Sequence, residues 1–228
     1  MALILNIDTS ADTAIVCLAD DGKLISSFVN ESQKDHAAWI QVAIQKMMKE
    51  ADVSLQKLDA VGVSIGPGSY TGLRIGLSTA KGICYALNIP LITEISLRIM
   101  AFSAIQYLSD SDPELLTSES LICPMIDARR LEVFTAIYAS NMREIMQPCA
   151  YNLDVDSFEQ ELGRQKILFL GNGSVKFRQV CTNQNAIFKK IPLNPVAICG
   201  LTYKNFIGNN FADLTYTEPL YLKEFFTR

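Results

Sequence analysis

The sequence predicts an α/β protein built from two similar lobes, and three observations support this. Apolar runs of strand length alternate with amphipathic helical segments along the 228 residues. One polar stretch near the middle, Ser109–Ser120, has the composition of a linker. After it, the same order of elements returns. We therefore expect an internal duplication, with lobes at 1–108 and 109–228, a cleft between them, and a last segment that packs back on the first lobe.

The first lobe is expected to open with an antiparallel meander, followed by alternating helices and strands. Asp20-Asp21-Gly22 separates the second and third apolar runs, and Asp-Gly favours a hairpin there because glycine takes the positive φ that the turn needs. The expected elements are strands Leu3–Asp8, Thr13–Ala19 and Lys23–Val29, helix Ala37–Ala51, strand Ala60–Ile65, helix Thr71–Leu87, strand Pro90–Thr93 and helix Ser96–Leu108.

The second half repeats this order of elements, together with the acidic and glycine residues that follow its strands. Its first strand ends in Asp127, as the first strand of the chain ends in Asp8, and a Gly-Asn-Gly-Ser turn at Gly171 echoes the Gly-Pro-Gly-Ser turn at Gly66. These landmarks predict two copies of one unit, each a mixed sheet flanked by helices. The expected elements are strands Leu121–Asp127, Leu131–Ala139 and Glu144–Tyr151, helix Val155–Leu162, strand Lys166–Leu170 and helix Pro195–Ile207.

The glycine turn at Gly66 and the helix after it are the most distinctive stretch of the chain. Ser69 or Thr71 can cap this helix with a hydroxyl group. The turn lacks the Lys-Ser/Thr of a phosphate-binding P-loop, and its glycines have one residue too many for a dinucleotide fingerprint. One helix face is nearly bare, with small residues spaced four apart: Gly72, Gly76, Ala80 and Cys84. We expect this ridge to receive a second helix at close range. The glycine turn itself either binds a phosphate at the helix N-terminus or is a tight turn with close packing.

Composition excludes several classes of protein. With a net charge of −4 and a pI near 5.1, the chain has no overall positive potential that would bind nucleic acid. The apolar start lacks the basic region of a signal peptide, and no apolar run reaches the length of a membrane span. The six cysteines lack C-x-x-C spacing and lie mostly in apolar runs, which is typical of buried thiols in a cytoplasmic protein.

Few residues could perform chemistry. His36 is the only histidine, and we expect it at the surface or at a helix entry. Asp8 and Asp127, at strand ends, either bind a metal-nucleotide or are satisfied by nearby amides. The other residues of a possible nucleotide cleft are the turn residues Gly66, Gly68, Ser69 and Gly171. The charged residues that could form ion pairs with a partner, or simply be solvated, are Arg74, Arg129, Arg130 and Glu132.

Four motifs occur in order along the chain. They are ILNIDTS at the start, GPGSYTGLRIGLSTAKGI with IPLITEISL, IDARRLEVF, and a terminal PLYLKE, spanning Ile4 to Glu224. In this order they resemble the TsaB (also called YeaZ) family, bacterial accessory subunits in making threonylcarbamoyladenosine in tRNA. The first motif is shared by the wider actin-like superfamily (ASKHA, ribonuclease H-like). The resemblance therefore implies two duplicated actin-like lobes with mixed sheets flanked by helices.

The resemblance also implies a role without catalysis. The catalytic paralogue, TsaD, carries an H-x-x-x-H metal motif, and here Ser96 and Met100 stand where its histidines are expected, so we expect no metal site. It implies a dimer with that paralogue, an added ATPase (TsaE), contact with tRNA only through the complex, and a homodimer when alone. The implied interface lies on two helices of the first lobe: Trp39, Ile40, Ala43, Met47, Thr71, Gly72, Arg74, Ile75, Gly76, Thr79, Ala80 and Ile83.

A stand-alone ATP-binding enzyme of the actin-like superfamily is the rival hypothesis. It would use Asp8 and Asp127 around a metal-nucleotide. Weak binding of ATP or ADP is the only cofactor interaction that we consider. A metallopeptidase is excluded because the chain has one histidine and no H-E-x-x-H motif.

Overall fold

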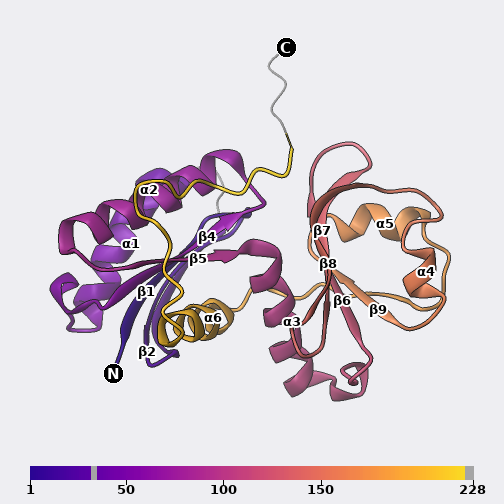
Figure 1. Ribbon diagram of the computed structural model, residues 1–228, viewed down its shortest axis with the longest axis horizontal. Coiled ribbons are helices and arrows are strands. Elements are labelled where there is room, and N and C mark those ends of the chain that lie inside the picture. Colours follow the sequence, from indigo (N-terminus) through magenta and orange to yellow (C-terminus); the bar gives the residue numbers. More distant parts are fainter. Residues whose placement is uncertain (32–34, 224–228) are drawn as a thin grey trace, which may run out of the picture. The chain divides into compact units, whose positions relative to one another are not determined.

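The computed structural model describes residues 1–31 and 35–223, so Glu224 of the terminal motif lies outside the described residues. The chain divides into two compact units (Figure 1). Unit 1 comprises residues 1–96 and 194–220, and unit 2 comprises residues 97–193 together with the segment that begins at Tyr221. This division differs from the expected one at 108/109. The later residues 194–220 return to unit 1, because the helix at their start packs on the first sheet.

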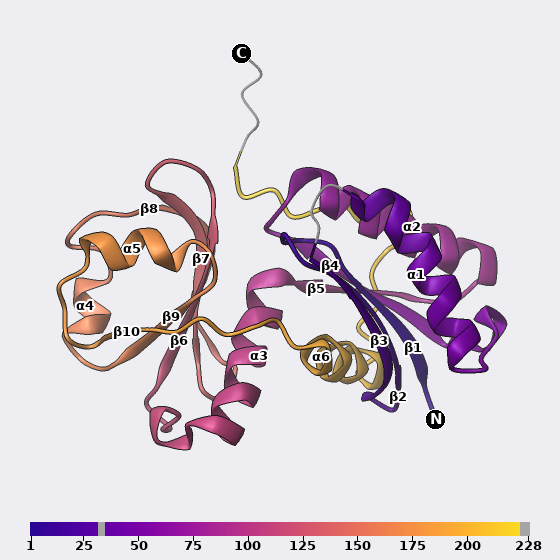
Figure 2. The ribbon, with the colours of Figure 1, turned by 180° about the vertical axis from the view of Figure 1, so that it is seen from behind.

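Unit 1 contains a five-stranded mixed sheet with the order β3-β2-β1-β4-β5. β1, β2 and β3 form the predicted antiparallel meander, and β4 and β5 run parallel to β1. Helices α1 and α2 cover one face of the sheet and α6 covers the other (Figures 1 and 2). The bounds are β1 Leu3–Asp8, β2 Ala14–Asp20, β3 Lys23–Asn30, α1 His36–Glu50, β4 Ala60–Gly66, α2 Tyr70–Leu87, β5 Leu91–Ile95 and α6 Pro195–Ile207.

Unit 2 repeats this arrangement, with the sheet order β10-β9-β6-β7-β8. Its first three strands again form an antiparallel meander, and its last two run parallel to the first. The matching strand relations confirm the predicted duplicated α/β fold. The bounds are α3 Ser96–Ser111, β6 Leu121–Asp127, β7 Glu132–Ala139, β8 Glu144–Asn152, α4 Glu159–Leu162, β9 Ile167–Leu170, α5 Ser174–Val180 and β10 Ala186–Phe188. Short 3-10 turns lie at η2 Leu55–Lys57, in unit 1, and η3 Pro113–Leu115, in unit 2.

Three local predictions in the second half were wrong. The helix expected over Val155–Leu162 shrinks to the single turn of α4, the linker begins only after α3 has ended at Ser111, and β10 was not predicted. β10 has three half-buried residues, too few for a periodic signal. It is recognisable only because it pairs with β9 at the edge of the sheet.

Each unit has its own core. In unit 1 the apolar stripe of α1 and one face of α2 pack against β1, β2 and β4. In unit 2 the core is aromatic: the ring centroids of Phe169 and Phe177 lie 4.8 Å apart, and Phe158 lies within 5.5 Å of both. No helix among the described residues has the length and apolarity needed to cross a membrane.

The segment after α6 runs back along unit 1 as an extended tail. It bridges the edge strand β5, is held to α2 by a lysine, and ends at the glycine turn after β4. The bonds, in that order, are Ala212 N to Leu91 O (2.8 Å), Lys81 Nζ to Thr215 O and Thr217 O (3.1 Å each), and Leu220 N to Ile65 O (2.7 Å). Within the described residues, the tail therefore pairs with the edge strand β5 at its first residue, Leu91, and leaves the rest of that edge unpaired by the tail.

Candidate functional site

Helices α1 and α2 together present an exposed surface on unit 1. The two helices are joined where Gln41 Nε2 donates to Thr79 Oγ1 at 3.2 Å. Val42 is 62% exposed, and a Cβ built on Gly82 would have no atom within 4 Å. We define the α1–α2 face as the exposed and half-buried residues Ala38, Trp39, Gln41, Val42, Thr71, Arg74, Ile75, Thr79, Gly82, Ile83 and Ala86. It combines small residues with isolated apolar ones.

The bare ridge of α2 does not belong to this face, so its expected role was wrong. Gly72, Gly76, Ala80 and Cys84 are all buried against the sheet of unit 1. A Cβ on Gly72 would lie 2.0 Å from the carbonyl oxygen of Thr9, and one on Gly76 would lie 2.3 Å from Thr9 Oγ1. The small residues therefore let α2 approach the end of β1, and they are not available to a partner helix.

The apolar stripe of α1 is corrected in the same way. Ile40, Ala43 and Met47 are at most 3% exposed because they form the core between α1 and the sheet. A stripe of apolar residues on a surface helix indicates a buried face, and here the chain itself covers that face. The expected interface residues that still reach the surface are Trp39, Thr71, Arg74, Ile75, Thr79 and Ile83. Four residues of the α1–α2 face were not predicted: Ala38, Val42, Gly82 and Ala86. They could be found only by knowing which side of each helix packs on the sheet.

At the end of β1, the predicted nucleotide residues of unit 1 gather around the glycine turn. Asp8 Oδ1 accepts hydrogen bonds from Ser10 Oγ (2.7 Å) and Ser64 Oγ (2.5 Å). The backbone amide of Ser69 donates to the carbonyl of Ser10 at 2.7 Å, and a Cβ on Gly68 would lie 2.1 Å from that same oxygen. The Ser69 amide is thus already bonded to the carbonyl of Ser10 and is not available to bind a phosphate.

Two further residues of this turn have local roles. Gly66 has a φ of +114°, which only glycine adopts freely, and a Cβ there would lie 3.0 Å from the carbonyl oxygen of Leu220 in the tail. Ser69 is the N-cap of α2, since its Oγ accepts from the amide of Gly72 at 3.3 Å. Of the two predicted caps, Ser69 is therefore the one used.

Unit 2 has the same pair of features, an acid at a strand end beside a glycine turn. Asp127 Oδ1 accepts from Lys176 Nζ and from the amide of Arg129, each at 2.6 Å, and the Asp127 amide donates to Asn172 Oδ1. Partial burial raises the pKa of Asp127, but the bonds from Lys176 and Arg129 outweigh it, so the pKa lies below its usual value. Gly171, with φ +87°, lies against β6 two residues before this acid, since a Cβ on it would lie 2.3 Å from the carbonyl oxygen of Met125. Asp8 and Asp127 therefore occupy matching positions in separate units.

His36 begins α1, so of the two expected positions, the surface or a helix entry, the structure places it at a helix entry. It is 3% exposed and its Nε2 lies 3.3 Å from the carbonyl oxygen of Ala11. Within the described part of the chain, no group of three or more His, Cys, Asp or Glu side chains could hold a metal ion. All six cysteines are free. Ser96 and Met100 both lie on α3, and neither side chain supplies an imidazole.

Two five-stranded sheets with matching strand relations, each flanked by helices, define the chain as an α/β protein built from two copies of one unit. Residues 24–215 match the family described as "TsaD: tRNA N6-adenosine threonylcarbamoyltransferase", which is more than half of the chain. The chain belongs to this TsaD-related family and, within it, to the TsaB (YeaZ) group.

Individual relatives agree with this assignment. The Bacillus subtilis tRNA threonylcarbamoyladenosine biosynthesis protein TsaB is 29% identical over 180 residues, 78% of this chain and 74% of that protein. A Geobacter sulfurreducens tRNA N6-adenosine threonylcarbamoyltransferase is 35% identical over 106 residues, 40% of this chain but only 31% of that enzyme. A Pseudomonas aeruginosa structure described as similar to the peptidase YEAZ covers 98% of this chain and 100% of its own, with a TM-score of 0.82 at 21% identity. The last comparison shows the same fold.

Proposed function

We propose that this protein is a non-catalytic accessory subunit for threonylcarbamoylation of the adenosine next to the anticodon in tRNA. It dimerises with a TsaD-like catalytic paralogue, a TsaE-like ATPase joins the pair, and the chain alone forms a homodimer. The name of the B. subtilis relative supports the pathway. The α1–α2 face is the observation that carries the proposal of a partner. Since tRNA is the substrate of the assembly, the protein acts in the cytoplasm.

The α1–α2 face has the properties that helix-on-helix docking requires. Gly82 and Ala86 lie one turn apart on α2 and are both exposed, and Ala38 is exposed on α1. Small residues let the backbone of a partner helix come close, while the half-buried Ile75 and Ile83 provide apolar contact. The partner would therefore lie against this face and leave the buried ridge untouched.

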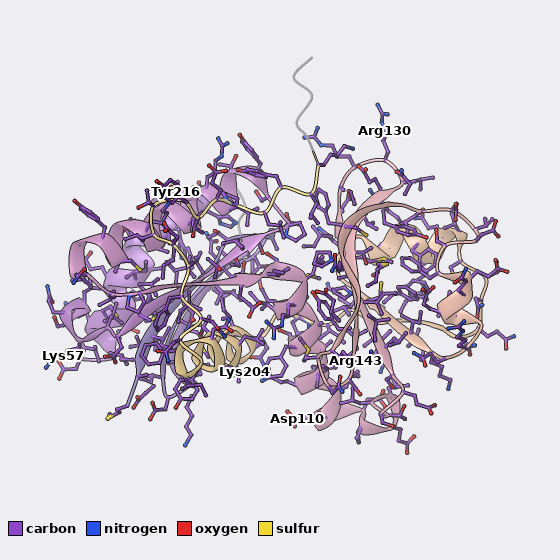
Figure 3. The ribbon with its side chains drawn as sticks, viewed as in Figure 1. Lys57, Asp110, Arg130, Arg143, Lys204 and Tyr216 are labelled. Carbon is purple, nitrogen blue, oxygen red and sulfur yellow. The ribbon has the colours of Figure 1, made fainter. Side chains whose placement is uncertain are left out.

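Substitution of Gly82 tests this surface. Gly82→Trp puts bulk into open space, so unit 1 should fold normally but the partner helix should be blocked. Lys204→Trp is the matched control, because Lys204 is also exposed but lies on α6, on the other face of the sheet (Figure 3). Light scattering after size-exclusion chromatography should show a one-to-one complex with the paralogue for wild type and Lys204→Trp only. Normal assembly by Gly82→Trp would contradict the proposed interface.

The lack of catalysis is proposed on two grounds. Ser96 and Met100 replace the histidines that the resemblance places there, and at the end of β1 the Ser69 amide is bonded to Ser10. Calorimetry with MgATP should therefore detect weak binding at most. Micromolar binding and turnover by the chain alone, lost in Asp8→Asn, would favour the rival ATP-dependent enzyme.

A further inference from the structure

The turn between β6 and β7 carries two arginines in a backbone conformation that arginine rarely adopts. Arg129 has a φ of +73° and Arg130 a φ of +47°, both in the left-handed region. Glycine or asparagine occupies such positions at lower cost. A disfavoured conformation at two successive residues persists only where surrounding contacts hold it, and such strain tends to occur at functional sites.

Several bonds hold this turn. The Asp127 carboxylate accepts from the amide of Arg129 (2.6 Å), and the amide of Glu132 donates to the carbonyl of Arg129 (3.0 Å). The amide of Ala128 donates to the carbonyl of Glu132 at 3.1 Å. The backbone is therefore closed at the base of the turn, while the side chains at its tip remain in solvent.

The acids nearest to the arginines are already paired with lysines. Asp127 forms an ion pair with Lys176 at 2.6 Å, and Glu132 forms one with Lys223 at 2.5 Å. Among the described residues, neither Arg129 nor Arg130 has an ion pair or a side-chain hydrogen bond, and both are exposed. Figure 3 shows Arg130 pointing away from unit 2 at the tip of this turn. The tip thus presents two cations without local neutralisation.

The equivalent turn of unit 1 is different. Between β1 and β2, Thr9 Oγ1 donates to the carbonyl of Gly72 (2.6 Å), and the carbonyl of Ser10 accepts from Ser69. That turn packs against its own glycine turn and carries no basic residue. The cationic tip is therefore a property of unit 2 alone, and the duplicated fold does not require it.

We propose that Arg129 and Arg130 contact phosphate groups of the tRNA backbone. This inference rests on the proposed function, which makes tRNA the substrate of the assembly. A guanidinium pairs with a phosphate bidentately, and each phosphate contact adds affinity by itself through counterion release. An acidic protein partner fits less well, because a stable protein interface covers about 800 Å² on each side and a single projecting turn is too small for that. With a net charge of −4, the chain contributes a local contact and the rest of the complex supplies the others.

The test measures binding of a tRNA transcript to the assembled complex across a series of salt concentrations. Arg129→Gln with Arg130→Gln should weaken binding on the order of tenfold and lower the slope of log K against log salt by about 1.4 to 1.8, at roughly 0.7 to 0.9 for each phosphate. Arg143→Gln is the matched control, because Arg143 is an exposed arginine near the β7–β8 turn at the other end of β7 (Figure 3). It should leave the slope unchanged.

A second variant separates binding from folding. Arg129→Gly with Arg130→Asn relieves the left-handed conformation, so its thermal midpoint should rise while tRNA binding is lost to the same extent. An unchanged salt slope in both double variants would overturn the inference, and so would an equal loss in Arg143→Gln. Loss of the paralogue instead of tRNA would identify the tip as a protein contact and also overturn it. A wild-type complex that binds no tRNA would refute the proposed function, and this inference with it.

Discussion

Two glycines on α2 should respond in opposite ways to the same substitution. A methyl group on Gly76 would lie 2.3 Å from Thr9 Oγ1, inside van der Waals contact, whereas one on Gly82 would meet nothing within 4 Å. Both positions lie inside the helix, so alanine gains about 1 kcal/mol of helix propensity at each. At Gly82 this gain is the whole effect, and we expect Gly82→Ala to stabilise unit 1 by about 1 kcal/mol.

At Gly76 the gain is outweighed. Overpacking a well-packed core costs about 1–3 kcal/mol. Moving the Thr9 hydroxyl away also breaks its buried bond to the carbonyl of Gly72, which costs about 1 kcal/mol. Gly76→Ala should therefore destabilise unit 1 by about 1–3 kcal/mol, and the two variants should differ by about 2–4 kcal/mol.

Urea unfolding followed by tryptophan fluorescence is the suitable assay, because Trp39 is the only tryptophan and lies on α1 in unit 1. Thr9→Ala combined with Gly76→Ala should recover much of the loss, because the clashing oxygen is gone. Equal urea midpoints for Gly76→Ala and Gly82→Ala would refute the conclusion that the bare ridge is a packing surface within the chain.

Three other outcomes are expected. Burial raises the pKa of Cys84 to about 11 and that of Cys123 to about 12. After treatment of the native protein with iodoacetamide at pH 8, mass spectrometry should therefore find both thiols unalkylated. Rapid labelling of either thiol would contradict their burial. Because the pKa of Asp127 is lowered, its contribution to stability is present above its unfolded value of 3.8 and is lost as pH falls through the lower folded value. Lys176→Met should raise that pKa in an NMR titration, and no change would contradict the ion pair. Lys81→Met removes the two bonds that hold the middle of the tail, so proteolysis within residues 208–223 should accelerate, and unchanged cleavage would argue against that anchor.

Much of the fold could be predicted because the signals were local and repeated. The acid at the end of the first strand and the glycine turn after the fourth occur in both halves, and the structure confirms the duplicated sheets around them. Boundaries failed where the signal was short, as at β10, or where α3 continued into the polar stretch. The sequence analysis expects a last segment that packs back on the first lobe, but it gives no bounds for that segment, because the return of residues 194–220 to unit 1 depends on tertiary packing.

The candidate site was harder to predict. A ridge of small residues indicates that something approaches closely, but it does not say what, and the sheet of unit 1 proved to be the neighbour of Gly76. The same ambiguity applies to the stripe of α1. Residues such as Val42 and Gly82 gained importance only when the buried side of each helix was known. The arginine turn carried a signal of another kind, a pair of bulky residues where a hairpin favours glycine or asparagine.

The discontinuous composition of unit 1 has a consequence for synthesis on the ribosome. The first 96 residues emerge early, but α6, which covers one face of their sheet, belongs to the segment 194–220. At about 5–20 residues per second, the roughly 100 residues between them take about 5–20 s to translate. Throughout that interval one face of the nascent first sheet lacks its covering helix, while unit 2 is made as a nearly continuous insertion. The nascent chain should therefore be most exposed to chaperones and proteases before residue 207 has left the exit tunnel.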